Sequence, residues 1–183
     1  PRRVNGIDCL VSRSGYTGED GFEISVPAEH AEALAATLLG HDEVWPIGLG
    51  ARDSLRLEAG LCLYGHDIDT TTTPVQAGLT WAIQKVRRPG GERAGGYPGE
   101  QAIAAQLANG APTKRVGLVG LERVPVREGA HIVDDAGAAL GRVTSGTVGP
   151  SVGQPIAMAD VPAALAVPGT VVHADVRGKR QPM

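Results

Sequence analysis

Two arginines and an aspartate lie among leucines in residues 49–60, where a surface helix would normally keep charged and apolar side chains on separate faces. At about 100° per residue, Arg52, Arg56 and Asp53 share a sector of roughly 100° with a leucine on either flank. Arginines four positions apart repel each other by roughly 0.2–0.5 kcal/mol when they are exposed and unpaired. Asp53 can neutralise only one of them, so we expect another carboxylate or an anionic ligand to lie between the two.

A glutamate precedes this helix on a strand-like segment. Phe22, Ile24 and Val26 alternate with polar residues, which is the period of a half-buried strand and turns Glu23 away from the apolar face. A glutamate in such a position is usually just solvated. The leucines beside Arg52 predict its partial burial, and a buried guanidinium requires an acceptor. Periodicity leaves open whether that acceptor is the neighbouring aspartate, Glu23 or a ligand.

Other groups of chemically active residues give weaker signals. Gly48-Leu49-Gly50 opens a helix as a dinucleotide-binding turn would, but Asp53 replaces the third glycine and would repel a pyrophosphate. The five histidines are scattered without metal-ligand spacing, and no nucleophile elbow occurs. Asp67 and Asp69 could coordinate a hard cation, although two loop carboxylates are more often turn residues. These patterns predict neither a metal site nor a catalytic residue in this chain.

Composition excludes several classes of function. The 183 residues carry a net charge of −3 and no long basic cluster, which argues against nucleic acid as a partner. No apolar run approaches the roughly 20 residues that cross a bilayer, so we expect no membrane segment. Neither of the two cysteines belongs to a C-x-x-C pair, which disfavours zinc and disulfides and favours a reducing, cytoplasmic location.

The first part of the chain has α+β patterning. A connection with three glycines at 14–21 precedes the strand around Glu23. Helix start and stop residues predict helices at 28–39, 49–59 and 98–108. Thr73-Pro74-Val75-Gln76 forms a capping box that starts a short helix, and residues 80–86 favour a strand.

From Lys114 onward the sequence pattern changes to short β-type runs separated by turn residues. The runs are 115–121, 131–133, 142–148, 156–160 and 170–176. Such spacing predicts a small all-β barrel or sandwich. We therefore place a domain boundary between 1–112, which is α+β, and 113–183, which is all-β.

Four motifs in a fixed order carry a family resemblance. They are Ser14–Ile24, Ala51–Gly60, Tyr64–Asp69 and Thr73–Leu79. Together they resemble the aminomethyltransferase, or T-protein, of the glycine cleavage system, and Arg142–Gly146 matches the C-terminal barrel of that family. The resemblance runs along almost the whole chain. It implies the C-terminal part of a folate-binding aminomethyltransferase domain followed by a small β-barrel domain.

The resemblance also implies a reaction and its participants. The family transfers the aminomethyl group from the lipoyl arm of the H-protein to tetrahydrofolate, releases ammonia and makes 5,10-methylenetetrahydrofolate. Glu23 occupies the position of the family's folate-binding glutamate, and Arg52 that of a folate-binding arginine. Tyr16 is in place to add an aromatic wall. A carboxylate can pair with adjacent N–H donors of an aminopyrimidinone ring, and a guanidinium suits carbonyl or carboxylate oxygens.

Two departures from the family lead us to expect a fragment. The family's catalytic aspartate belongs to its N-terminal portion, and Asp8, Asp53 and Asp67 do not occupy that position. Family members also continue past the equivalent of Met183 into an aromatic tail. We therefore expect a barrel with its last strand or tail truncated, apolar surface exposed where the rest of the protein docks, and no activity from this chain alone.

Two related functions remain as alternatives. One is the folate-binding domain of a dimethylglycine or sarcosine oxidising enzyme, although residues 61–69 favour the glycine cleavage branch. The other is a non-enzymatic folate-binding protein that assists iron–sulfur assembly. Its cysteine-bearing glycine motif is absent here, because Cys62 lies between two leucines.

Overall fold

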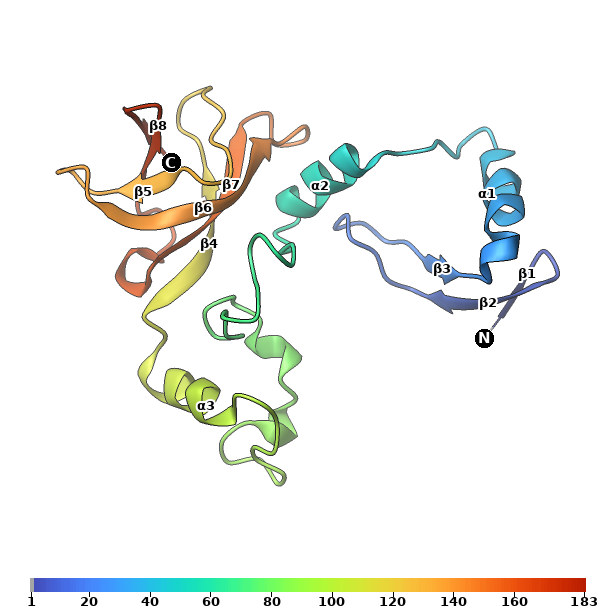
Figure 1. The fold of residues 1–183 in the computed structure, drawn as a ribbon, viewed down its shortest axis with the longest axis horizontal. Coiled ribbons are helices and arrows are strands. Elements are labelled where there is room, and N and C mark those ends of the chain that lie inside the picture. The colour runs from blue at the N-terminus through green and yellow to red at the C-terminus, as the bar shows by residue number, and fades with distance from the viewer. Residues whose placement is uncertain (1) are drawn as a thin grey trace. The chain divides into compact units, whose positions relative to one another are not determined.

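The computed structural model describes residues 2–183 and divides them into two compact units (Figure 1). The first unit ends at Leu61, and the second is Cys62–Met183. Helices and strands occur in both, and the second contains a barrel-like sheet, which confirms the predicted α+β class with a β-barrel part. The domain boundary that the sequence places at 112/113 stays a prediction.

A three-stranded antiparallel sheet organises the first unit, in the order β1-β2-β3. The strands are β1 (Arg2–Val4), β2 (Ile7–Ser12) and β3 (Glu23–Ser25). Asn5 and Gly6 join β1 to β2 with positive φ at both positions, the conformation that an Asn-Gly hairpin turn adopts. That dipeptide is the sequence signal for the first hairpin, which the apolar alternation around Glu23 does not reveal.

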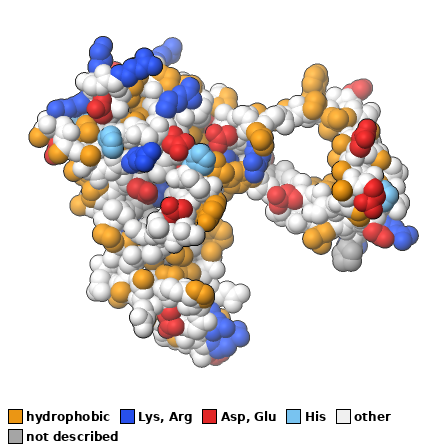
Figure 2. All heavy atoms as spheres, viewed as in Figure 1, with side chains coloured by type: hydrophobic (Ala, Val, Ile, Leu, Met, Phe, Trp, Pro, Cys, Tyr) orange, Lys and Arg blue, Asp and Glu red, His pale blue; other side chains and the backbone are white. Residues whose placement is uncertain are grey.

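Helices follow the sheet close to where the sequence predicts them. The segment after Pro27 begins as a 3₁₀ turn, η1 (Ala28–His30), and continues as α1 (Ala31–Leu39). The arginine-bearing helix is α2 (Leu49–Glu58). Few apolar side chains of this unit are buried, whereas the following are 61–75% exposed: Leu10, Phe22, Trp45, Ile47 and Leu49. Figure 2 shows such apolar side chains on the surface of this unit. Exposed apolar surface of this kind is typical of docking faces, as the sequence leads us to expect.

The second unit contains one helix and a six-stranded antiparallel sheet in the order β4-β7-β6-β5-β8-β9. The helix is α3 (Glu100–Asn109). The strands are β4 (Thr113–Val119), β5 (His131–Val133), β6 (Ala139–Val148), β7 (Pro155–Pro162), β8 (His173–Val176) and β9 (Lys179–Pro182). The two ends of the sheet approach each other, since the Leu121 N–H beyond β4 donates to the Pro182 carbonyl of β9 at 2.9 Å. This contact gives the sheet its barrel-like form.

The barrel core is made of small and branched apolar side chains. Its fully buried members include Ile132, Val143, Ala159 and Ala174. Exposed and less exposed positions alternate over Val116–Val119 of β4, the period of two of a half-buried strand, whereas β7 is buried along most of its length. The pattern missed β9, because Lys179–Pro182 carries two cations and a glutamine rather than apolar residues.

The predicted strand at 80–86 is wrong. The segment forms two 3₁₀ turns, η2 (Thr80–Ala82) and η3 (Lys85–Arg87). The Arg88 guanidinium donates to the carbonyls of Ile83 and Thr80 at 2.9 and 2.7 Å. A side chain therefore satisfies backbone acceptors that a strand would have offered to a neighbour.

The capping box before this segment is confirmed in its hydrogen bonds. Thr73 N–H donates to Oε1 of Gln76 at 3.1 Å, and Gln76 N–H donates to Oγ1 of Thr73 at 3.2 Å. The turn that it starts does not extend into a helix, because Gly78 adopts a positive φ of 72° and reverses the chain.

A buried aspartate fixes the loop before the capping box to the barrel. Asp67 is 1% exposed. Its Oδ1 accepts from the Thr144 hydroxyl at 2.5 Å, and its Oδ2 accepts from the Leu63 N–H at 2.8 Å. Asp69 instead folds back on its own turn and accepts from Thr71. Asp69 is therefore a turn residue, as the sequence suggests. Among residues 2–183, no three His, Cys, Asp or Glu side chains form a group that could hold a metal ion.

We expect Thr144→Val to lower the free energy of unfolding of the second unit by about 1–3 kcal/mol. The change keeps the branched shape but leaves the buried Asp67 carboxylate without its hydroxyl donor. Urea denaturation measures the effect. Thr147→Val on the same strand is the matched control, and equal stability of the two variants would contradict the role given to this bond.

Asp160 on β7 provides a pH-dependent test. Burial and the nearby Asp67 carboxylate raise the pKa of the Asp160 carboxyl above its usual value, against the opposing charge of Arg115. The native state therefore binds this proton more tightly than the unfolded chain does, and native stability falls as the pH rises through the two pKa values.

We expect Asp160→Asn to raise the free energy of unfolding at neutral pH. The gain should disappear in acid below the pKa of an unfolded aspartate, where both states of the parent protein are protonated. Denaturation at a series of pH values measures the difference, with the exposed Asp135→Asn as control. A gain that stays constant with pH would rule out the carboxyl as its source.

Candidate functional site

Arg56 is the buried charge around which α2 is built. Its side chain is only 2% exposed and lies among apolar neighbours. The guanidinium donates from Nε to Oδ1 of Asp53 at 2.7 Å and from Nη1 to the Leu61 carbonyl at 3.2 Å. Asp53 therefore serves this one arginine, as the sequence indicates, and the second arginine of the pair takes a different partner.

Arg52 lies on the exposed side of α2. Its guanidinium carbon is 4.7 Å from the centroid of the Tyr16 ring, a cation–π contact. The predicted partial burial of Arg52 is wrong: the helix turns Arg56 and Leu57 inward, and Leu49, one turn before Arg52, is 75% exposed. The second arginine of the pair, Arg52, therefore packs on an aromatic ring and not against a carboxylate.

The connection between β2 and β3 carries Tyr16 to this position. Arg13 and Asp20 close its base through two hydrogen bonds of 2.9 and 2.7 Å. Gly18 has a φ of +81°, and a Cβ added there would lie 2.5 Å from the Cβ of Ala59, so only glycine permits this approach of the connection to the end of α2. The glycines that predicted a tight turn thus also place the ring over Arg52.

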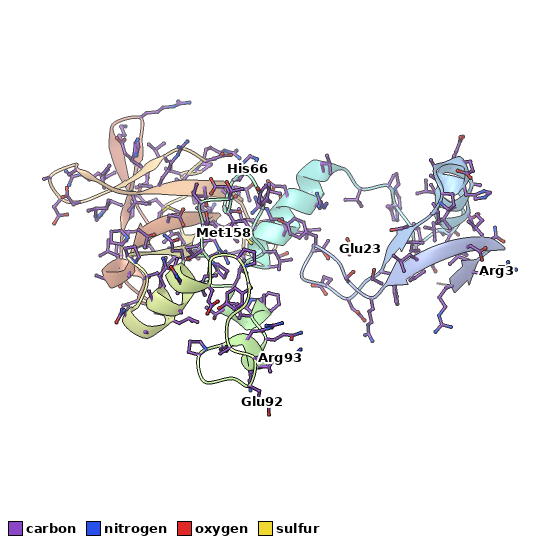
Figure 3. All side chains as sticks on the ribbon, turned by 60° about the horizontal axis from the view of Figure 1, so that its bottom comes forward. Arg3, Glu23, His66, Glu92, Arg93 and Met158 are labelled. Atoms are coloured by element: carbon purple, nitrogen blue, oxygen red, sulfur yellow. The ribbon has the colours of Figure 1, made fainter. Side chains whose placement is uncertain are left out.

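Glu23 begins β3 opposite Ser12, and Figure 3 labels its place in the first unit. The Ser14 hydroxyl donates to its Oε2 atom. Glu23 and Arg52 both line a pocket of about 270 Å³, together with Ser14, Tyr16 and residues of the glycine-rich connection. The structure therefore brings the two predicted site residues together, at an open surface.

The pocket is suited to binding rather than to covalent chemistry. Its lining offers two carboxylates as acceptors, those of Glu19 and Glu23, one guanidinium as donor and two aromatic residues, and it includes neither histidine nor cysteine. Such a set recognises a flat ligand that presents adjacent N–H donors at one edge and acceptor oxygens elsewhere. Ser14 is the member that sequence analysis missed. Its only signal is its place at the first position of the glycine-rich connection.

Comparison with family models identifies two matches. Residues 1–87 match a model described as the GCVT N-terminal domain. Residues 114–183 match the glycine cleavage T-protein C-terminal barrel domain. The second match coincides with the strands of the barrel-like sheet, from β4 to β9.

Full-length relatives agree with these models. The chain is 50% identical over 177 residues to a probable mitochondrial aminomethyltransferase of Schizosaccharomyces pombe, covering 97% of this chain and 44% of the relative. It is 53% identical over 174 residues to the mitochondrial aminomethyltransferase of Gallus gallus, covering 95% and 43%. The crystal structure of glycine cleavage system aminomethyltransferase T from Bartonella henselae superposes with a TM-score of 0.89 at 50% identity, covering 96% and 47%. The chain spans less than half the length of these relatives.

The relatives correct the predicted cytoplasmic location. Those from Schizosaccharomyces pombe, Dictyostelium discoideum, Gallus gallus and Pisum sativum are all named as mitochondrial. Cys9 and Cys62 are indeed free thiols. Free thiols indicate a reducing environment but do not distinguish one reducing compartment from another, which is why the inference from cysteine usage is wrong. Among residues 2–183 no helix is long and apolar enough to cross a bilayer.

The pairing within α2 gives a prediction about this site. We expect Asp53→Asn to speed amide hydrogen exchange across residues 49–58 by roughly tenfold, because Arg56 would keep its charge while losing its anionic partner. Mass spectrometry of deuterated peptides measures the change. Asp20→Asn removes the partner of Arg13 in a largely exposed pair, and should leave these amides unaltered. Unchanged exchange in Asp53→Asn would show that the helix does not depend on this ion pair.

Proposed function

We propose that this chain, which belongs to the glycine cleavage T-protein family, carries the folate-anchoring residues of a tetrahydrofolate-dependent aminomethyltransferase. The observation that supports the proposal most directly is the pocket shared by Glu23 and Arg52. The reaction is the transfer of an aminomethyl group from the lipoyl arm of H-protein, with release of ammonia. Bound tetrahydrofolate would supply the N5 and N10 atoms that receive the one-carbon unit.

Glu23 binds the pterin edge of the cofactor. A carboxylate has two oxygens and about four acceptor positions, so the bond from Ser14 to Oε2 leaves capacity for two adjacent N–H donors of an aminopyrimidinone ring. The same bond holds the carboxylate in one orientation before the ligand arrives. A preoriented acceptor loses less conformational entropy on binding than a mobile glutamate would.

Arg52 binds oxygen atoms of the same ligand. Its guanidinium carbon lies over the Tyr16 ring at 4.7 Å from the centroid, a cation–π contact that holds the head group in the pocket. No acceptor among residues 2–183 takes a hydrogen bond from this guanidinium, in contrast to that of Arg56. The fixed fork matches carbonyl or carboxylate oxygens of the cofactor.

Glu23 and Arg52 position the cofactor and do not transfer protons. Both lie at an open surface, where the carboxylate serves as hydrogen-bond acceptor and the guanidinium as donor. Holding the acceptor nitrogen against the incoming carbon can by itself supply several kcal/mol of rate acceleration. The general acid, the H-protein contact and the remaining pocket walls belong, in this proposal, to the complete enzyme.

In the complete enzyme, we expect Glu23→Ala to weaken tetrahydrofolate binding by about tenfold or more, because the pterin edge loses its charged acceptor. Isothermal titration with tetrahydrofolate measures the affinity. Glu29→Ala is the matched control, since Glu29 is exposed on η1 of the same unit and does not line the pocket.

Arg52→Lys is a companion variant that keeps the positive charge but loses the planar fork and its stacking on Tyr16. We expect it to weaken binding as well. Equal affinities for tetrahydrofolate in Glu23→Ala and Glu29→Ala would remove the assignment of Glu23, whatever the result for Arg52→Lys.

A further inference from the structure

A second cavity lies in the barrel-like unit, far along the sequence from Glu23 and Arg52. It encloses about 780 Å³ and is formed by the loop between β4 and β5 and by the β8–β9 hairpin. Its lining residues are Val124, Pro125, Arg127, Glu128, Ala130, Asp175, Val176, Arg177, Lys179 and Gln181. Cavities of this size hold small-molecule ligands, and the mouth of a β-barrel is one of their usual places.

Gln181 forms part of the inner wall of this cavity. It pairs with Ala174 across β8 and β9, and directly paired residues project to the same face of a sheet. Ala174 is fully buried in the core, so Gln181 faces inward, and it is 8% exposed. Its Oε1 atom is buried and accepts no hydrogen bond from any of residues 2–183.

An unpartnered buried amide oxygen is costly and therefore points to a missing donor. The other side of Gln181 is occupied by the packed barrel core, so the donor must come from the cavity. The terminal torsion of a glutamine is broad, which allows the oxygen to turn toward a ligand N–H.

Positive charge is concentrated at the rim of the cavity. Three cationic side chains line it against two carboxylates: Asp175 accepts from the uncharged Gly178 N–H at 2.7 Å, and Glu128 pairs with His66 Nδ1 at 2.8 Å. Among residues 2–183, no hydrogen bond or ion pair occupies the side chains of Arg127, Arg177 and Lys179. Figure 2 shows Lys and Arg side chains gathered over the β8–β9 end of this unit. The rim therefore attracts an anion.

The hairpin turn holds one of these cations in place. Arg177 and Gly178 have φ values of +56° and +77°, the conformation of a two-residue hairpin turn. Asn, Asp or Gly usually occupies the first of these positions, because a left-handed backbone costs other residues about 1–2 kcal/mol. Asparagine is consequently a replacement for Arg177 that removes the charge and preserves the turn.

We propose that this barrel mouth binds a small organic anion that also carries an N–H donor, of the class of N-acylated amino dicarboxylates. Carboxylates of the ligand contact Arg127, Arg177 and Lys179, and its amide N–H donates to Oε1 of Gln181. The apolar floor of Val124, Pro125 and Val176 packs against the acyl group. The site lies wholly within Cys62–Met183 and does not rest on the folate proposal.

Isothermal titration with two probes separates the contribution of the ligand's carboxylates to the affinity from that of its N–H donor. N-acetyl-L-glutamate has two carboxylates and an amide N–H, whereas glutarate has two carboxylates and no N–H. We expect N-acetyl-L-glutamate to bind about tenfold more tightly than glutarate. Gln181→Met removes the acceptor at similar volume, and should abolish that difference while leaving glutarate binding unchanged.

Arg177→Asn should weaken both probes, and more strongly at low ionic strength than at high. Arg123→Asn is the matched control, because Arg123 belongs to the same loop as Arg127 but does not line the cavity. Thermal melting checks that each variant is folded. The proposal fails if N-acetyl-L-glutamate does not bind at millimolar concentration, if glutarate or inorganic phosphate binds as tightly, or if Gln181→Met leaves the preference intact.

Discussion

The pairing of one carboxylate, Asp53, with only one of two neighbouring arginines determines the arrangement of α2. Asp53 pairs with the buried Arg56, because a guanidinium removed from water cannot remain without an anionic acceptor. This pairing leaves Arg52 on the outer side of the same helix with its charge unneutralised, and the aromatic ring of Tyr16 packs against it. A buried ion pair and an exposed cation on an aromatic ring therefore arise from the same four-residue spacing. If both arginines were paired internally, α2 would be more stable but would offer nothing to an anion.

The barrel-like unit uses two buried polar groups in opposite ways. Asp67 in the barrel-like unit is fully satisfied by Thr144 and Leu63, so it fixes one loop against β6. Gln181 is also buried, at 8% exposure, but has an acceptor without a donor. A satisfied buried network specifies a unique packing. An unsatisfied buried acceptor instead destabilises the protein, and a ligand that donates a hydrogen bond to it would remove that cost. The position of each polar group on the sheet, rather than its residue type, determines which of the two roles it has.

Sequence patterns predicted those features that depend on local spacing. Alternation and capping residues gave α1, α2, α3 and most of the barrel strands, and four ordered motifs gave the family. The patterns failed where contacts with residues outside a segment determine its secondary structure more than its own apolar spacing does. Arg88 binds the carbonyls of 80–83 and prevents a strand, and polar β9 is held by its pairing with β8 rather than by apolar alternation. The burial of Arg56 instead of Arg52 also escaped prediction, because helical periodicity defines a face but not which edge of that face is covered.

The Glu23–Arg52 pocket lies between a strand and a helix of the first unit, joined by the glycine-rich connection. Glu23 is fixed by the register of β3 against β2, whereas Arg52 is fixed by α2. The connection carrying Ser14 and Tyr16 touches both: its hydroxyl orients the carboxylate and its ring packs on the guanidinium. Gly18 allows this connection to lie against the end of α2 with no side chain between them. A single loop thus sets the distance between acceptor and donor, so the geometry of ligand recognition depends on the conformation of that loop more than on the packing of the unit.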